Sequence, residues 1–352
     1  MKVLIINPGA TSTKIAVFEE GQELMRKGID HAAEDLAKFA RIVDQTDYRR
    51  ALIEKTLMEA GYKMTDFDAV CGRGGLLRHI PSGTYAINAR VLEDIADPPY
   101  GEHASNLGAV LAKQLADSVG IPSFFADPPS VDEMQDIARV SGLNGIERQS
   151  FFHALNHKAV ARKASGRLGK TYEELNLIVV HLGGGVSVAA HSHGRVVDTF
   201  NVKDDGAMGL DRSGGLPVTA IVNLCFSGKT KNEIKKMLSL EAGVFSYLKT
   251  KDFREVEHRA FSENNGEAEK IFRAFAYQLA KDIGAMAAVL RYKVDAIVYT
   301  GGIANSDRLC DELSSYVESI APVIRIPGEE EMRSLAEGAL RVLHGQPAKE
   351  YV

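Results

Sequence analysis

The chain has 352 residues, 45% of them hydrophobic and 25% charged, which is typical of a soluble protein of two domains. Its net charge of −5 argues against a nucleic acid or an anionic membrane as partner, because both attract basic surfaces. The three cysteines lack zinc-site or disulfide spacing, and we find neither a signal peptide nor a run of about 18 uncharged apolar residues, so we expect a cytoplasmic protein that does not span a membrane.

Short apolar runs alternate with helix-period patterns along the chain, which indicates an α/β protein. The expected strands are residues 3–7, 14–18, 69–72, 123–126, 177–181, 186–191, 296–300 and 323–326. The expected helices are residues 36–60, 106–119, 156–168, 218–226, 267–290, 306–320 and 330–344. In the helix 267–290, apolar side chains recur every three or four residues, which predicts one buried stripe. Its members are Ile271, Phe275, Leu279, Ile283 and Met286.

The segments 4–24 and 178–197 repeat one pattern, in which a strand, a turn of small residues, a second strand and a glycine turn follow one another. Asn7 and His181 occupy the same position, at the end of the first strand. Such a repeat suggests a duplicated domain. We therefore expect two similar lobes that hold one ligand between their glycine-rich turns.

The turn of the first copy holds more small and hydroxyl residues than a chain reversal needs. Glycine-rich turns leave backbone N–H groups free for an anion, and Thr11, Thr13 and Lys14 could add donors. A decorated hairpin explains this one turn about as well. Similar turns at strand ends in HLGGG (181–185) and TGG (300–302) favour phosphate binding.

Several isolated residues allow two interpretations. Arg73 and Arg212 lie beside glycines, where a guanidinium can reach an oxyanion with two bonds, although a single arginine is more often solvated. His153 and His157 have helical spacing but lack the glutamate of an HExxH zinc site. Asp127 ends a strand, where either a magnesium ligand or a helix cap fits.

Two further features have ordinary explanations. NLCFSGKT (223–230) resembles a Walker A loop, but Asn223 replaces a required glycine and the preceding run is helical. His191 and His193 flank a hairpin turn, where we expect both to be exposed.

Together these motifs, in this order over essentially the whole chain, resemble the acetate kinase family of the actin-like, sugar kinase and Hsp70 phosphotransferase superfamily, and most closely its butyrate kinase branch. The resemblance implies two duplicated ribonuclease H-like lobes, residues 1–130 with 332–352 and residues 131–331, with a nucleotide cleft between them. VYTGGIANS (298–306) resembles the adenosine motif, and KDFRE (251–255) resembles a segment near adenine. The implied phosphate- and nucleotide-binding residues are Thr11, Thr13, Lys14, His181, Gly183, Gly184, Gly185, Asp252, Arg254, Gly301, Gly302 and Asn305.

The same resemblance implies catalytic roles. The implied catalytic residues are Asn7, Arg73, Asp127, His153 and Arg212, and the implied magnesium ligands are Asp127 and Glu331. The two arginines match those that hold the carboxylate and the migrating phosphoryl group, and His153 matches a histidine that stabilises that group. The register of the glutamate remains open within the run from Glu329 to Glu331.

The activity implied is reversible phosphorylation of a short-chain carboxylate by ATP, which gives an acyl phosphate and ADP, with Mg²⁺ as cofactor and a homo-oligomer as the assembly. Members of the family place two valines where this chain has Gly74 and Gly75. We expect the vacated space, in a substrate pocket with Phe152, to favour butyrate or a branched acid. The alternatives are an acetate or propionate kinase of broad specificity and a non-catalytic nucleotide switch of the actin or Hsp70 type.

Overall fold

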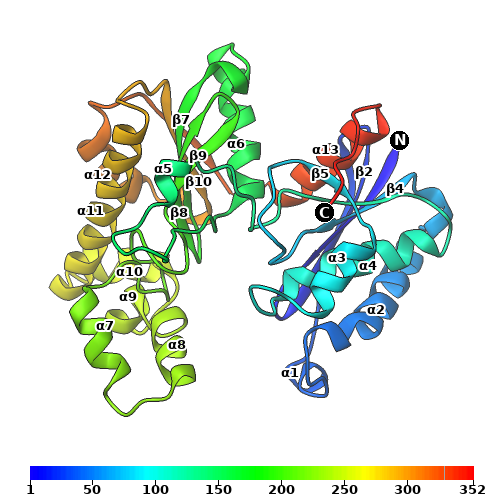
Figure 1. Cartoon of the computed structure of the whole chain (residues 1–352), viewed down its shortest axis with the longest axis horizontal. Helices are drawn as coiled ribbons and strands as arrows, with labels where there is room; N and C mark the ends of the chain where they lie inside the picture. Colours follow the sequence, from blue (N-terminus) through cyan, green and yellow to red (C-terminus); the bar gives the residue numbers. More distant parts are fainter. Residues whose placement is uncertain (329) are drawn as a thin grey trace. The chain divides into compact units, whose positions relative to one another are not determined.

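The computed structural model describes residues 1–328 and 330–352, which divide into two compact units (Figure 1). Unit 1 comprises Met1–Asp132 and Glu330–Val352, and unit 2 comprises Glu133–Glu329. These boundaries lie close to the expected ones, but Glu331 belongs to unit 1 rather than to the second lobe. Glu329, one of the three candidate magnesium-linked glutamates, lies outside the described residues.

Unit 1 is built on a six-stranded sheet in the order β3-β2-β1-β4-β6-β5. The strands are β1 (Lys2–Pro8), β2 (Ser12–Glu19), β3 (Gln22–Asp30), β4 (Ala69–Arg73), β5 (Thr84–Ala86) and β6 (Ser123–Ala126). The central strands β1, β4 and β6 are parallel, and the other three pair antiparallel. The run from Val3 to Ile6 is fully buried, as expected for a central strand that helices cover on both faces.

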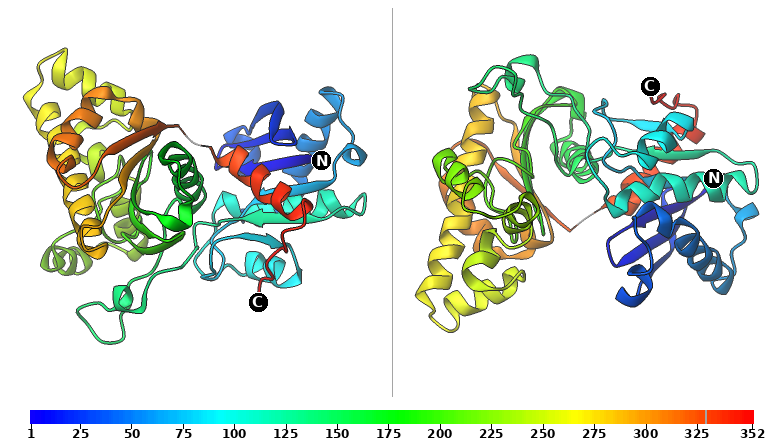
Figure 2. Two further views of the ribbon diagram at one scale, coloured as in Figure 1. Left: turned by 90° about the horizontal axis from the view of Figure 1, so that it is seen from above. Right: turned by 60° about the horizontal axis from the view of Figure 1, so that its bottom comes forward.

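Helices cover both faces of this sheet (Figure 2). The helices of the unit are α1 (Ala33–Leu36), α2 (Thr46–Glu59), α3 (Ala89–Ala96), α4 (Leu107–Asp117) and α13 (Glu331–Leu343), with short 3-10 turns η1 (Val43–Gln45), η2 (Met64–Asp66) and η3 (Ala104–Asn106), and α4 and α13 lie directly on the sheet. A Cβ on Gly72 would lie 2.0 Å from the carbonyl oxygen of Gly108, so α4 contacts the backbone of β4 directly. On the opposite face, a Cβ on Gly338 of α13 would lie 3.2 Å from the Cβ of Ala126. The expected helix 36–60 is too long, because α2 begins only at Thr46.

Unit 2 repeats the arrangement with five strands in the order β11-β10-β7-β8-β9. They are β7 (Asn176–Leu182), β8 (Val186–Ser192), β9 (Arg195–Thr199), β10 (Ala296–Gly301) and β11 (Val323–Pro327). The strands β7, β10 and β11 are parallel, and β8 and β9 complete an antiparallel hairpin series, as β2 and β3 do in unit 1. Asn7 and His181 are each the last residue but one of the first strand, which confirms the duplication.

The sheet of unit 2 lies between α6 on one side and α11 with α12 on the other (Figures 1 and 2). Its helices are α5 (Asp136–Arg139), α6 (Ala154–Leu168), α7 (Val218–Cys225), α8 (Lys231–Ser239), α9 (Gly243–Leu248), α10 (Phe253–Phe261), α11 (Gly266–Val289) and α12 (Asp307–Val317), with 3-10 turns η4 (Tyr172–Glu174) and η5 (Gly302–Asn305). All five residues of the stripe predicted on α11 are buried. The Walker A-like segment begins inside the helix α7 rather than after a strand, as expected. Among the described residues, no helix is long and apolar enough to cross a membrane.

Candidate functional site

Three residues predicted from the sequence meet at one edge of the unit 1 sheet. Asn7 is the last residue but one of β1, Arg73 is the last residue of its parallel neighbour β4, and Glu331 begins α13. The Glu331 carboxylate lies 2.8 Å and 2.9 Å from Nη1 of Arg73 and accepts a hydrogen bond from Nδ2 of Asn7 at 2.7 Å. Arg73 therefore forms an ion pair with an internal carboxylate in this structure.

Asp127 follows the third parallel strand, β6, at the same edge. Its carboxylate is 5% exposed, and Oδ1 accepts hydrogen bonds from Ser82 Oγ at 2.7 Å and from the Gly83 N–H at 2.8 Å. Its φ of +39° is unusual for a residue other than glycine. Because Asp127 binds the turn before β5, the helix-cap alternative is wrong.

The two carboxylates differ in their fit to Mg²⁺. This ion is usually held by one or two carboxylates together with substrate phosphates and water. Asp127 fits such a site, because both of its hydrogen bonds are made by one oxygen. Glu331 does not fit in this arrangement, since its oxygens are bound to Arg73 and Asn7. Among the described residues, no group of three or more His, Cys, Asp or Glu side chains could hold a metal ion.

A buried arginine that sequence reasoning missed supports the first glycine-rich turn. Arg49 of α2 is 1% exposed, and its Nη1 donates to the Gly9 carbonyl at 2.9 Å and to the Ser12 carbonyl at 3.3 Å. Its Nη2 donates to the Ala10 carbonyl at 3.2 Å. The guanidinium of Arg49 thus binds three backbone carbonyls of the turn and holds the turn in one conformation. No signal in the sequence distinguishes Arg49 from the neighbouring surface arginine of the same helix.

Of the side chains expected to donate to a phosphate from this turn, Thr11 and Lys14 are exposed and Thr13 is not. The Thr13 hydroxyl is bound to His31 Nε2 at 2.8 Å and accepts from Arg49 at 3.1 Å. Burial and the nearby Arg49 charge lower the pKa of His31 to about 4, so this ring is neutral at pH 7. The expectation that Thr13 offers its hydroxyl to a ligand is therefore wrong.

Gly74 and Gly75 do not vacate space for a longer acid. A Cβ on Gly74 would lie 2.7 Å from Pro128 Cβ, and a Cβ on Gly75 would lie 2.1 Å from Asn106 Oδ1. These glycines let the segment after β4 pack against its neighbours, and the volume of the missing side chains is already filled. The expectation of a wider pocket at this point is wrong.

In unit 2, two stacked imidazoles face the glycine turn between β7 and β8. The rings of His153 and His181 are 3.9 Å apart and inclined by 14°. A Cβ on Gly183 would lie 2.7 Å from His181 Nε2, and one on Gly185 would lie 3.2 Å from His153 Nε2. A Cβ on Gly185 would also lie 3.4 Å from Nη1 of Arg212. The structure thus brings two predicted histidines and a predicted arginine to one predicted turn.

Behind these rings lies a buried polar cluster. His153 Nδ1 and His157 Nε2 each lie 2.8 Å from Ser187 Oγ, and His157 continues to His191. His191 was expected at the surface, but the second strand of the hairpin is covered on both faces, so the ring is fully buried; His193 is exposed. Phe152, expected in the substrate pocket, is 2% exposed, and its ring packs edge-on against His157.

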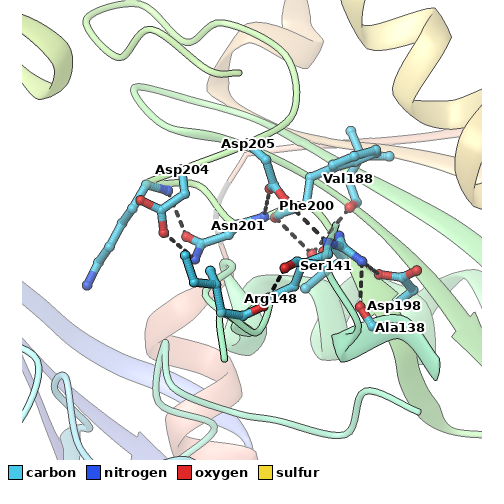
Figure 3. A network of polar contacts seen from close by, with 12 residues as sticks. Ala138, Ser141, Arg148, Val188, Asp198, Phe200, Asn201, Asp204 and Asp205 are labelled. Atoms are coloured by element: carbon cyan, nitrogen blue, oxygen red, sulfur yellow. Dashed lines mark hydrogen bonds and ion pairs between the residues drawn. The ribbon is translucent and has the colours of Figure 1, made fainter. Parts of the chain in front are cut away.

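A second arginine that sequence reasoning missed, Arg148, binds the end of β9 and the start of the loop that follows it (Figure 3). Arg148 forms ion pairs with Asp198 of β9 at 2.9 Å and with Asp205 at 3.4 Å, and it donates to the Thr199 carbonyl at 2.8 Å. Burial raises the pKa of both aspartates, and the Arg148 charge opposes this rise. Asp205 in turn accepts the N–H of Asn201, so the loop is bound at its base.

A cavity of about 980 Å³ in unit 2 joins the remaining predicted segments. The predicted residues that line it are Gly183, Gly184, Asp252, Arg254, Gly302 and Asn305. Asp252 accepts the N–H of Arg254 at 2.9 Å and so begins α10 as its N-cap, and the two side chains form an exposed ion pair. Gly301 has φ +87°, and a Cβ there would lie 2.3 Å from the Leu182 carbonyl oxygen, so only glycine fits this approach.

Comparison with known proteins places this geometry in context. Residues 139–321 match the model of the acetokinase family. The chain is 46% identical to butyrate kinase 1 of Clostridium acetobutylicum over 99% of each chain. Among solved structures, it is similar to an acetate kinase from Porphyromonas gingivalis, with a TM-score of 0.81 and 20% identity over 97% of this chain and 99% of that one. A propionate kinase from Francisella tularensis gives a TM-score of 0.77 at 20% identity, over 96% and 98% of the two chains.

Proposed function

The chain belongs to the acetokinase family, and on this premise we propose that it transfers the γ-phosphoryl group of ATP to a short-chain carboxylate, reversibly, to give an acyl phosphate and ADP. The observation that carries the proposal is the cavity of about 980 Å³ in unit 2. Two glycine turns at strand ends and the N-cap of α10 line it, and its size is that of a typical small-molecule site. Backbone N–H groups of such turns suit phosphates, and the remainder of the cavity has room for a nucleoside.

The roles follow from charge. A carboxylate is a nucleophile at neutral pH, so the reaction needs no general base and depends on positioning and charge neutralisation. Arg73 orients the acid, as it now orients the Glu331 carboxylate. Arg212 and His153, beside Gly185, stabilise the phosphoryl group in flight. When bound, Mg²⁺ would offset phosphate charge, and Asp127 is the residue that would hold it.

For the acid, we propose butyrate or a branched acid of similar length, because a butyrate kinase is the relative at 46% identity. The packing around Gly74 and Gly75 removes the steric reason to exclude smaller acids. An acetate or propionate kinase of broad specificity is therefore the second candidate. We further propose that the protein is a cytoplasmic homo-oligomer.

The test is a hydroxamate assay, which traps acyl phosphate, with ATP, Mg²⁺ and one acid at a time. We expect kcat/KM to be highest for butyrate or isobutyrate and lower for propionate and acetate. A clear preference for acetate would overturn the acid proposed. Absence of acyl phosphate with every acid, at nucleotide concentrations that protect the protein from thermal unfolding, would overturn the activity and favour a nucleotide switch.

A further inference from the structure

A continuous chain of buried hydrogen bonds runs from the site of unit 2 into its core. Ser187 Oγ lies 2.8 Å from His153 Nδ1 and 2.8 Å from His157 Nε2. His157 Nδ1 lies 3.3 Å from His191 Nε2, and His191 Nδ1 lies 2.6 Å from the hydroxyl of Tyr172. The chain thus joins the N-cap of α6, two positions on β8 and the 3-10 turn η4.

The inner members of the chain are inaccessible to solvent. His157 and His191 have no exposed surface, and Ser187 is 2% exposed. Burial, with other positive groups nearby, holds the pKa of both imidazoles well below the usual value, so both rings are neutral. A neutral imidazole donates from one nitrogen and accepts at the other. The links on either side of His191 and of His157 must therefore point the same way along the chain.

We propose that Tyr172, His191, His157 and Ser187 act as positioning residues that set the tautomer of His153. The tyrosine hydroxyl donates to His191, His191 donates to His157, His157 donates to Ser187, and the serine hydroxyl donates to Nδ1 of His153. The proton of the His153 ring is then carried on Nε2, the nitrogen that faces the glycine turn at Gly185.

The direction follows from the outermost link. A phenol, with a pKa near 10, is a good donor, and an imidazole nitrogen is a better acceptor than a phenol oxygen. The short distance of 2.6 Å fits an O–H donated to His191 Nδ1. That choice fixes the links as far as Ser187, because each neutral ring donates only once along the chain. Ser187 Oγ then accepts from His157 and from the backbone N–H of His153 at 3.5 Å, so both of its lone pairs are used and its one hydrogen is left for His153 Nδ1.

The catalytic consequence of this tautomer rests on the proposed function. With the proton on Nε2, His153 presents a donor to negative charge that develops on a phosphoryl group at the turn. With the proton on Nδ1, the same nitrogen would present a lone pair and repel that charge. Stacking on His181 at 3.9 Å restricts rotation of the ring, so the tautomer decides what the site offers.

The direct test reads the tautomer without substrate. In full-length protein labelled with ¹⁵N-histidine, long-range ¹H–¹⁵N correlation distinguishes Nε2–H from Nδ1–H rings, and a His153→Gln spectrum assigns the signals. We expect the Nε2–H form in the unmodified protein. We expect the Nδ1–H form to gain population in Tyr172→Phe, which keeps the ring, and in Ser187→Ala. A His153 ring that carries its proton on Nδ1 in the unmodified protein, or that keeps its tautomer in both variants, would overturn the proposal.

Kinetics supply a second readout. Loss of a hydrogen-bond partner that fixes the tautomer of a metal-bound histidine typically costs about 10–100-fold. By analogy we expect Tyr172→Phe to lower kcat by about tenfold with KM for ATP and acid nearly unchanged. The matched control is Tyr299→Phe, because Tyr299 is fully buried in the same unit and contributes no atom to the chain. Equal kcat values for the two variants would overturn the catalytic consequence. A tautomer that responds in a protein without carboxylate kinase activity would instead refute the proposed function alone.

Discussion

The buried guanidinium of Arg49 offers a sharp test of how the first glycine-rich turn is held. In the variant Arg49→Met, a side chain of comparable length replaces the charge. Three turn carbonyls and the Thr13 hydroxyl then each lose one hydrogen bond from the guanidinium, while the Ser12 carbonyl keeps the one from the Gly9 N–H. At about 1.5 kcal/mol each, the low end for bonds to a charged group, the loss is about 6 kcal/mol. The variant recovers roughly half of this, because the desolvation of a buried charge costs several kcal/mol.

We therefore expect a net loss of about 3 kcal/mol, which lowers the Tm of a unit of this size by roughly 6–12 °C. Scanning calorimetry measures the shift, and hydrogen exchange of residues 9–13 localises it. The control is Arg50→Met, since Arg50 is the next residue of the same helix and makes only an exposed ion pair with Glu54. If the two variants have the same Tm, the turn does not depend on the buried charge and the reasoning is refuted.

Three further predictions concern the rest of the site. Gly301→Ala should destabilise unit 2 by about 2 kcal/mol or more, because the φ of Gly301 is +87° and a Cβ would clash with the Leu182 carbonyl. Gly302→Ala should be tolerated, and urea unfolding compares the stability of the two variants. Burial raises the pKa of Asp282 from 3.8 to about 7, so between these values the folded protein binds a proton that the unfolded chain does not, and its stability should fall as pH rises from about 4 to 7 and then level off. Asp282→Asn should flatten this dependence in calorimetry. Arg73→Ala and Arg212→Ala should each lower kcat/KM for the acid by about 100-fold or more, as expected for the loss of a preorganised donor; near-normal turnover in the hydroxamate assay would contradict their assignment.

Local pattern predicted the central strands of both sheets but missed β3, β5 and β9, which are edge strands. The apolar runs of β1 and β7 and the helical stripe of α11 need only their own residues to be recognised, because burial of one face imposes a fixed period. The equivalence of Asn7 and His181 could be recognised for the same reason, since the two copies of a duplicated domain keep similar strand and turn lengths.

Errors arose where a side chain's environment comes from distant parts of the chain. The hydroxyl of Thr13 turns inward because it forms hydrogen bonds with Arg49 and His31, and nothing in the sequence of the turn indicates these partners. Asn106, some thirty positions later in the chain, fills the space that a side chain on Gly75 would occupy. An argument from the missing side chains alone therefore gave the wrong pocket volume. The sequence near His191 predicts an exposed turn residue, but the packing around β8 buries its side chain.

The sequence by itself determined the α/β class, the duplication, the glycine turns and the family, since each depends on the order and spacing of residues along the chain. Only the tertiary structure decided which polar groups are available and which are already bound. Hydrogen bonds and packing join residues that are remote in sequence, and a buried donor takes whatever acceptor the fold brings within about 3 Å. For that reason Arg49, Arg148 and the hydrogen-bonded chain behind His153 became visible only when the two units were folded.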